Sequence, residues 1–130
     1  MYKKSSVYPE RYYHISRKDL GRECTLIPSE GYSPSGVSFA PTIAKCLSAV
    51  PYYFTGQRAD WERRKRFVKQ GNIWYVYTPV KKTEAISISS KMTPDVLYSK
   101  ERRVLGNVKV KRIGKIRVSV GYNRWKIDWL

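Results

Sequence analysis

The chain has 130 residues, of which 26 are Lys or Arg and 10 are Asp or Glu, so its formal net charge at pH 7 is +16. This length predicts a single domain over residues 1–130 with a core of its own. Within it, the polar residues 1–10 are expected to form a flexible arm. The surplus of cations excludes an acidic, solvating chain. It predicts a polyanionic partner, of which nucleic acid is the commonest.

Membrane and metal partners are not expected. No apolar run approaches the roughly 20 residues of a membrane-spanning helix, and the N-terminal residues lack the apolar core of a secretory signal. Cys24 and Cys46 lie in apolar settings, which favours reduced thiols over a disulfide and predicts a cytoplasmic protein. A single His without closely spaced Cys residues argues against a zinc site.

The first half of the chain predicts short strands and one amphipathic helix. Ring and β-branched residues indicate strands at 11–16, 24–27 and 37–40. The last of these runs directly into a helix at 42–50, with Pro41 at its first position. Such a junction leaves free backbone N–H groups where an anion could bind, and ordinary strand–helix packing is the alternative.

A second helix is expected at about 59–70. Asp60 is a suitable N-cap and Gly71 a suitable end. This helix carries an unbroken basic run that either faces solvent or contacts phosphate groups. The residues of that run are Arg63, Arg64, Lys65 and Arg66.

From residue 72 onward the sequence becomes rich in β-forming residues. Strands are expected at 73–78, 85–89, 104–113, 115–122 and within 123–130. The strands at 104–113 and 115–122 are expected to form an antiparallel pair with one cationic side. The cations assigned to nucleic-acid contact there are Lys109, Lys111, Lys115 and Arg117. The fold class predicted is therefore α+β, with two short antiparallel sheets forming a split core beside two short helices.

Residues that could carry catalysis are few. The sequence has no Ser-His-Asp order, no phosphate-binding P-loop and no carboxylates paired in sequence. His14 is the only histidine, and it is either a hydrogen-bonded strand residue or a site residue. Glu101 is isolated in Tyr-Ser-Lys-Glu-Arg-Arg, where it either offsets neighbouring cations or acts in a site.

Three short motifs, in order, resemble a known family. Tyr13-His14-Ile15-Ser16 is similar to the first-strand motif of the ADP-ribosyltransferase fold, in its histidine-containing, poly-ADP-ribose-polymerase-like branch. Gly36-Val37-Ser38-Phe39-Ala40 and the following helix resemble that branch's Gly-x-Tyr-Phe-Ala segment. The stretch from Ser99 to Leu105 resembles the segment that contains the family's late catalytic Glu. The motifs span residues 12–120, and the size and charge would suit a small bacteriophage-encoded member.

The resemblance implies an NAD-dependent transferase that modifies a macromolecule. NAD would be a substrate: His14 would bind its adenosine-side ribose, and Gly36 would contact the nicotinamide amide. Glu101 would hold the nicotinamide ribose and stabilise the positive charge that develops as nicotinamide leaves.

The sequence departs from the family at two aromatic positions. Ser38 stands where the family has a ring-stacking Tyr, and Ala49 stands near its second aromatic. Tyr52 or Tyr53 could substitute as contacts for NAD. Arginine-rich relatives that remove a 2′-phosphate from RNA share the fold, and Arg102 or Arg103 could fill the role of their last Arg.

Two hypotheses follow from the sequence. The first is an ADP-ribosyltransferase whose acceptor is a nucleic acid or a nucleic-acid-associated protein. The alternative is a non-catalytic basic module that binds nucleic acid through cationic strands and exposed tyrosines.

Overall fold

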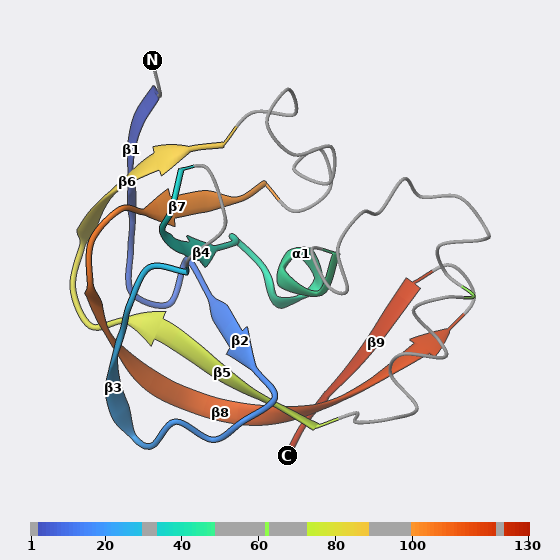
Figure 1. Cartoon of the computed structure of the whole chain (residues 1–130). Helices are drawn as coiled ribbons and strands as arrows, with labels where there is room; N and C mark the ends of the chain where they lie inside the picture. Colours follow the sequence, from blue (N-terminus) through green and yellow to red (C-terminus); the bar gives the residue numbers. More distant parts are fainter. Residues whose placement is uncertain (1–2, 30–33, 49–61, 63–72, 89–99, 122–123) are drawn as a thin grey trace.

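The computed structural model describes residues 3–29, 34–48, 62, 73–88, 100–121 and 124–130. This part of the chain is mostly antiparallel β-sheet with one short helix (Figure 1). In chain order the elements are β1 (Lys3–Val7), β2 (His14–Ser16), β3 (Glu23–Leu26), β4 (Val37–Phe39), α1 (Ile43–Ser48), β5 (Ile73–Pro79), β6 (Thr83–Ser87), β7 (Arg102–Val104), β8 (Val108–Gly121) and β9 (Arg124–Trp129).

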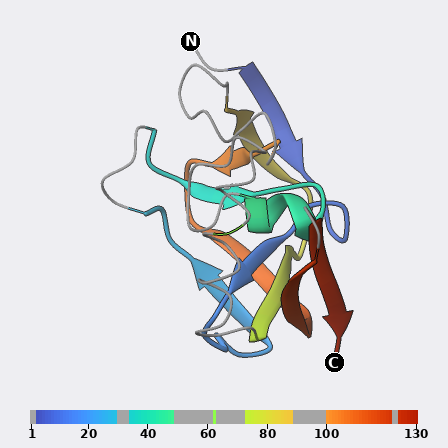
Figure 2. The same ribbon diagram turned by 90° about the vertical axis from the view of Figure 1, so that its right-hand side faces the viewer.

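The strands form two antiparallel sheets. One has the order β1-β6-β7-β4, and the other has the order β2-β5-β8-β3 with β9 paired to β8. Figures 1 and 2 show the long, curved β8 crossing the second sheet after the chain leaves β7 in the first. The sheets also meet where Tyr13 and Ala40 form an isolated bridge, with N···O distances of 2.8 and 3.0 Å.

One hydrophobic core lies between the two sheets. Val7, Phe39 and Val104 of the first sheet share a cluster with Tyr77 and Val110 of the second, and all five side chains are buried. Fully burying an aliphatic or aromatic side chain contributes about 1.5–3 kcal/mol. Contacts between the sheets therefore hold β4 and β7 in place against β5 and β8.

A second core lies between α1 and the five-stranded sheet, where Leu47 packs with Trp74 and Ile116. The helix begins after Thr42, whose Oγ1 accepts a hydrogen bond from the Lys45 N–H at 3.1 Å. Thr42 is thus the N-cap, and Pro41 precedes the cap instead of occupying the first helical position.

Both cysteines are free thiols, as their apolar settings indicate. Cys24 is half-buried, whereas Cys46 is buried on α1. Burial raises the pKa of the Cys46 thiol to about 12, because a charged thiolate is disfavoured away from water. Cys46 is therefore a protonated core residue.

The expected flexible arm at residues 1–10 is wrong, because Lys3–Val7 forms β1 at one edge of the four-stranded sheet. Each residue of β1 pairs with β6, and Val7 is buried in the core between the sheets. Lysine-rich edge strands are common because their charges oppose pairing with other chains. The polar composition therefore indicated an edge strand and not an arm.

The expected strand pair over 104–113 and 115–122 is also wrong. Residues 108–121 form the single strand β8. Tyr77 pairs with Arg112 and Val76 pairs with Gly114, so Ile113 is an extra residue in the ladder. Such an insertion is a β-bulge, which bends a strand without ending it. The break in the apolar pattern therefore marks a bend and not a hairpin.

Of the second helix expected at 59–70, only Glu62 is described, and it has helical conformation. The rest of that segment lies outside the described residues, as does the basic run at 63–66. The expected strands at 73–78, 85–89 and 123–130 correspond to β5, β6 and β9 with small shifts at their ends.

Gly36 is a packing constraint between β4 and β7. A Cβ atom at this buried position would lie 2.7 Å from the Val104 carbonyl oxygen and 2.9 Å from the Arg103 Cδ. We expect Gly36→Ala to lower the free energy of unfolding by about 1–3 kcal/mol through overpacking. Gly106→Ala is the control, since no heavy atom lies within 4 Å there. Equal unfolding free energies for the two variants in urea titrations would contradict this account.

Candidate active site

Three sequence motifs converge where the two sheets meet. The Tyr13–Ala40 bridge brings the start of β2 beside β4. The His14 Nδ1 lies 2.8 Å from the Ser38 carbonyl oxygen, and the His14 ring centroid is 5.9 Å from that of Phe39. Because a carbonyl oxygen only accepts hydrogen bonds, Nδ1 carries the proton and donates it. The opposite ring nitrogen, Nε2, is then an acceptor.

Glu101, directly before β7, is joined to this pair through Ser38. The Ser38 hydroxyl donates a short hydrogen bond to Glu101 Oε1. The same oxygen accepts from Arg103 Nε at 3.1 Å and from Arg103 Nη2 at 2.8 Å. His14, Ser38, Glu101 and Arg103 therefore form one connected set, hereafter the His14–Arg103 network.

The network is buried at one end and open at the other. Glu101 is 8% exposed and Arg103 is 4% exposed, whereas His14 is half-buried and Ser38 is exposed. The three donors to Oε1 leave Glu101 Oε2 without a hydrogen bond from the described residues. The Glu101 carboxylate is thus buried, with one oxygen fixed in place.

Arg103 fixes the loop before β4 as well as Glu101. Its Nη1 donates to the Pro34 carbonyl oxygen at 2.6 Å, and Gly36 packs against its side chain. In this structure Gly36 makes room for Arg103, whereas the sequence predicted a contact with nicotinamide. Contact between Gly36 and NAD stays a prediction.

Sequence reasoning did not identify Arg103 as the partner of Glu101. Residues two apart on a strand point to the same face, and Ser38 pairs directly with Arg103 in the β4–β7 ladder. The available signal in the sequence was an acidic and a basic residue two positions apart, beside a predicted strand. Arg102 instead donates to the Ser6 carbonyl oxygen at 2.6 Å and lies 4.5 Å from the Tyr12 ring centroid.

Burial lowers the pKa of His14 below its usual 6.5, although the hydrogen bond to the Ser38 carbonyl acts in the opposite direction. The charged imidazolium is disfavoured where water is excluded. At neutral pH the ring is therefore neutral, with Nδ1–H donating and Nε2 accepting.

Some of the remaining predicted site residues lie outside the described residues, and the others lie on two opposite faces of β8. Tyr52, Tyr53, Arg63, Arg64, Lys65 and Arg66 lie outside the described residues. Lys111 pairs with Thr78 and Lys115 pairs with Tyr75, and these β5 residues are three apart. Because strand faces alternate, Lys109 and Lys111 lie on the opposite sheet face from Lys115 and Arg117. The expectation of one cationic side for all four residues is wrong, because the bulge at Ile113 shifts the alternation of side chains along β8.

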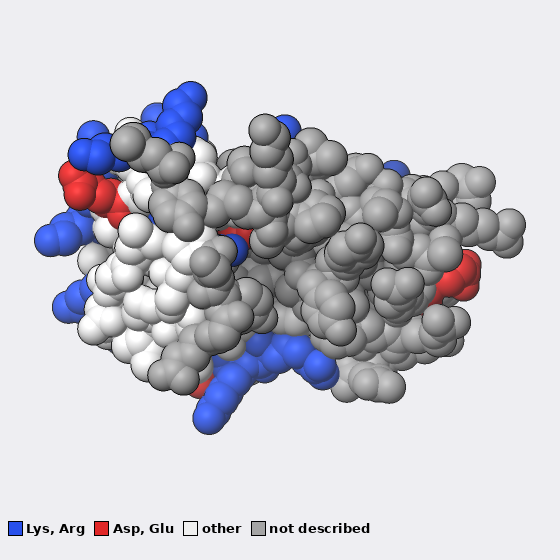
Figure 3. Space-filling view, turned by 45° about the horizontal axis from the view of Figure 1, so that its top comes forward, with Lys and Arg blue, Asp and Glu red and all other residues white. Residues whose placement is uncertain are grey.

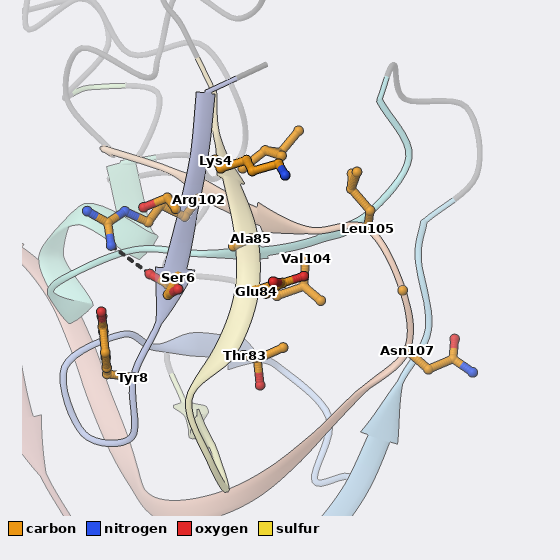
Figure 4. A pocket seen from close by; sticks show the side chains of 13 residues that line it. Lys4, Ser6, Tyr8, Thr83, Glu84, Ala85, Arg102, Val104, Leu105 and Asn107 are labelled. Carbon is orange, nitrogen blue, oxygen red and sulfur yellow. Dashed lines mark hydrogen bonds between the residues drawn. The ribbon is translucent and has the colours of Figure 1, made fainter. Parts of the chain in front are cut away.

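A separate groove lies on the four-stranded sheet (Figure 4). Its volume is about 910 Å³, and it is lined by β1, β6 and the residues from Val104 to Asn107. Tyr8, Glu84 and Arg102 also line it, so its charges are mixed. His14, Ser38 and Glu101 are not among its lining residues, and the groove is therefore distinct from the His14–Arg103 network.

Comparison of the chain with protein-family models, curated proteins and solved structures found no match. Within the described ranges, no group of three or more His, Cys, Asp or Glu side chains could hold a metal ion. Among the described residues, no helix is long and apolar enough to cross a membrane.

The lowered pKa of His14 predicts a pH-dependent stability. The unfolded imidazole binds a proton near pH 6.5, and the folded one binds it only at lower pH. Between these values the unfolded state holds more protons, so the free energy of unfolding rises with pH. This rise is complete above about pH 6.5. We expect urea unfolding between about pH 5 and pH 8 to show this rise.

His14→Gln is the matched variant, because His14 is the only histidine in the chain. This variant should lose the rise in unfolding free energy across that pH range. An identical pH profile in wild type and variant would show that His14 does not titrate as the burial predicts.

Arg103→Met should destabilise the protein by about 3–5 kcal/mol, because it leaves the Glu101 charge buried without a partner. The double variant Arg103→Met/Glu101→Gln should recover part of that loss, since the uncompensated charge is gone. Chemical denaturation of both variants measures this coupling. If Arg103→Met changes the unfolding free energy by no more than a surface substitution, about 0.5 kcal/mol, the ion pair is not a constraint on the fold.

Proposed function

We propose that the protein transfers ADP-ribose from NAD to a macromolecular acceptor, a nucleic acid or a nucleic-acid-associated protein. The observation that carries this proposal is the contact of His14, Ser38 and Glu101. These residues come from three separate motifs and are 24 and 63 residues apart along the chain. The family resemblance requires such convergence.

The residues present suit the chemistry of NAD. The nicotinamide leaving group of NAD departs with positive charge developing on the ribose carbon. In this proposal Glu101 stabilises that charge, because a fixed carboxylate in a partly water-excluded site needs little reorganisation. Oε2 is the oxygen available for a ribose hydroxyl, since Oε1 already accepts three hydrogen bonds.

His14 and Ser38 have supporting roles in the same proposal. The neutral imidazole holds an acceptor at Nε2, which suits a ribose hydroxyl donor. Ser38 fixes the Glu101 carboxylate by its hydroxyl and the His14 ring by its carbonyl oxygen. It orients both groups where the family's tyrosine would stack on a ring.

Arg103 limits how strongly Glu101 can act. A guanidinium at 2.8 Å balances much of the carboxylate charge, so part of the electrostatic effect is lost. In return, two nitrogens of the guanidinium hold the Oε1 atom of the carboxylate in place. Arg103 is therefore a positioning residue in this proposal.

Release of nicotinamide from NAD tests the proposal. Purified protein is incubated with NAD alone, with RNA, with single-stranded DNA and with a cell lysate, and free nicotinamide is measured. Release should fall by about 100-fold or more in Glu101→Gln, the size of effect seen when one stabilising group is removed. Adenylate-labelled NAD then identifies the acceptor that carries the label.

Glu84→Gln is the matched control because it makes the same change of charge at an exposed position of β6. Its release rate should equal that of wild type. Absence of nicotinamide release under every condition, or equal release by Glu101→Gln in folded protein, would exclude the transferase. Salt-sensitive nucleic-acid binding without turnover would instead favour the non-catalytic module.

A further inference from the structure

The distal half of β8 forms, with β5 and β9, a sheet face that carries exposed cations. Lys115 and Arg117 on β8 pair with Tyr75 and Ile73 of β5. Across the other edge of β8, Ser119 pairs with Lys126 and Gly121 pairs with Arg124. Paired residues share a face, so four cations line one surface. We call this surface, comprising Lys115, Arg117, Arg124 and Lys126, the cationic sheet face.

The core on the other side of the sheet fixes the direction of these side chains. Ile116 and Val118 alternate with the cations along β8, and they pack in the cluster that contains Leu47 of α1. The helix α1 also contacts β9. Because one face is buried beneath the helix, a register slip would bury charge. On the opposite face, the four cations at this end of the sheet are exposed.

The four cations are exposed, and none forms a salt bridge with the described residues. Asp128 pairs with Arg117 in the β8–β9 ladder and is exposed on the same face. Cations of this kind contribute little to folding, since even an exposed ion pair is worth about 0–1 kcal/mol. Their arrangement on neighbouring strands leaves a positive surface available to a polyanion.

We propose that the cationic sheet face binds single-stranded nucleic acid. Lys115, Arg117, Arg124 and Lys126 would contact the phosphates. The half-buried Tyr75, which pairs with Lys115 and packs against the core between the sheets, would supply the exposed part of its ring for base stacking. A polar strand face with basic side chains and an aromatic ring is a recurrent platform for single strands. This inference does not depend on the transferase proposal, because it uses none of the residues of the His14–Arg103 network.

The shape of the surface favours a single strand over a duplex. A β-ribbon that reads DNA enters a major groove about 12 Å wide. Here β8 and β9 are backed on their other face by the α1 core, so the pair cannot enter a groove as a free ribbon. Figure 3 shows Lys and Arg side chains at more than one place on the molecule, at the end near β1 and β6 and along the lower edge. The test must therefore separate local contact from total charge.

The matched comparison is between two double variants on one strand. Lys115→Ser/Arg117→Ser removes two cations from the cationic sheet face, and Lys109→Ser/Lys111→Ser removes two from the opposite face of β8. Fluorescence anisotropy with labelled single-stranded RNA of about 16 nucleotides reports affinity. Between about 50 and 200 mM salt, the first variant should lower the log–log salt slope by about 1.4, and the four-residue variant of the face should lower it by about 2.8.

Tyr75→Leu tests stacking apart from charge, and it should weaken binding about fivefold or more without changing the salt slope. Thermal unfolding of each variant shows whether it is folded. Equal effects of the two double variants would show that total charge, and not this face, determines affinity. Equal or tighter binding of a duplex of the same sequence, or no binding at all, would also overturn the proposal. Because these titrations contain no NAD, their failure is distinct from failure of the transferase assay.

Discussion

The buried charge of Glu101 constrains the junction of the two sheets. A carboxylate that is only 8% exposed requires a compensating cation. Arg103 on β7, two residues further along the chain, supplies it and is itself almost fully enclosed. An arginine in that position needs space, and the absence of a side chain at Gly36 provides it. Thus one ion pair determines which residues can occupy the loop before β4 and the start of β7.

Hydrogen bonds of Thr78 fix the segment that precedes His14. Thr78 Oγ1 accepts a hydrogen bond from the Glu10 N–H at 2.7 Å and donates to the Tyr12 carbonyl at 2.8 Å. Since Thr78 is fully buried on β5, the segment before β2 is tied to the interior of the second sheet. The imidazole at the start of β2 therefore meets the Ser38 carbonyl from a fixed direction, which suits a site that orients a ligand.

Local patterns in the sequence predicted most strands but not their connections. Residues 73–78 are rich in rings and β-branched side chains, and this segment became β5. Gly114 interrupts a similar pattern of residues. A turn and a β-bulge interrupt such a pattern in the same way, so the local sequence does not distinguish them. What distinguishes them is contact with distant residues: the Trp129 ring lies where a Gly114 Cβ would be, and β5 continues the ladder past the bulge. The strand Lys3–Val7 was missed because only its last residue is buried.

The same limit applies to the candidate site. The prediction that His14, Ser38 and Glu101 lie together came from a resemblance that connected the three motifs, and their role as a site stays a prediction. Composition and periodicity alone favour ordinary structural roles for each. The contact of Arg103 with Glu101 is local, but the pairing of Arg103 with Ser38 joins β4 to β7, two strands that are distant in sequence. No local window contains both sides of that contact.

Stability alone does not account for either charged feature of the molecule. Replacing a buried ion pair with apolar residues of similar volume is often neutral or stabilising, so the Glu101–Arg103 pair is a costly way to join β4 to β7. Exposed cations on one sheet face repel one another, and they disfavour the compact state. Each feature has a direct explanation if charge is needed where it lies: a carboxylate of fixed orientation beside His14, and a positive surface for phosphates on β8 and β9. A bound polyanion would also stabilise the folded chain, because ligands that bind only the native state shift the folding equilibrium towards it.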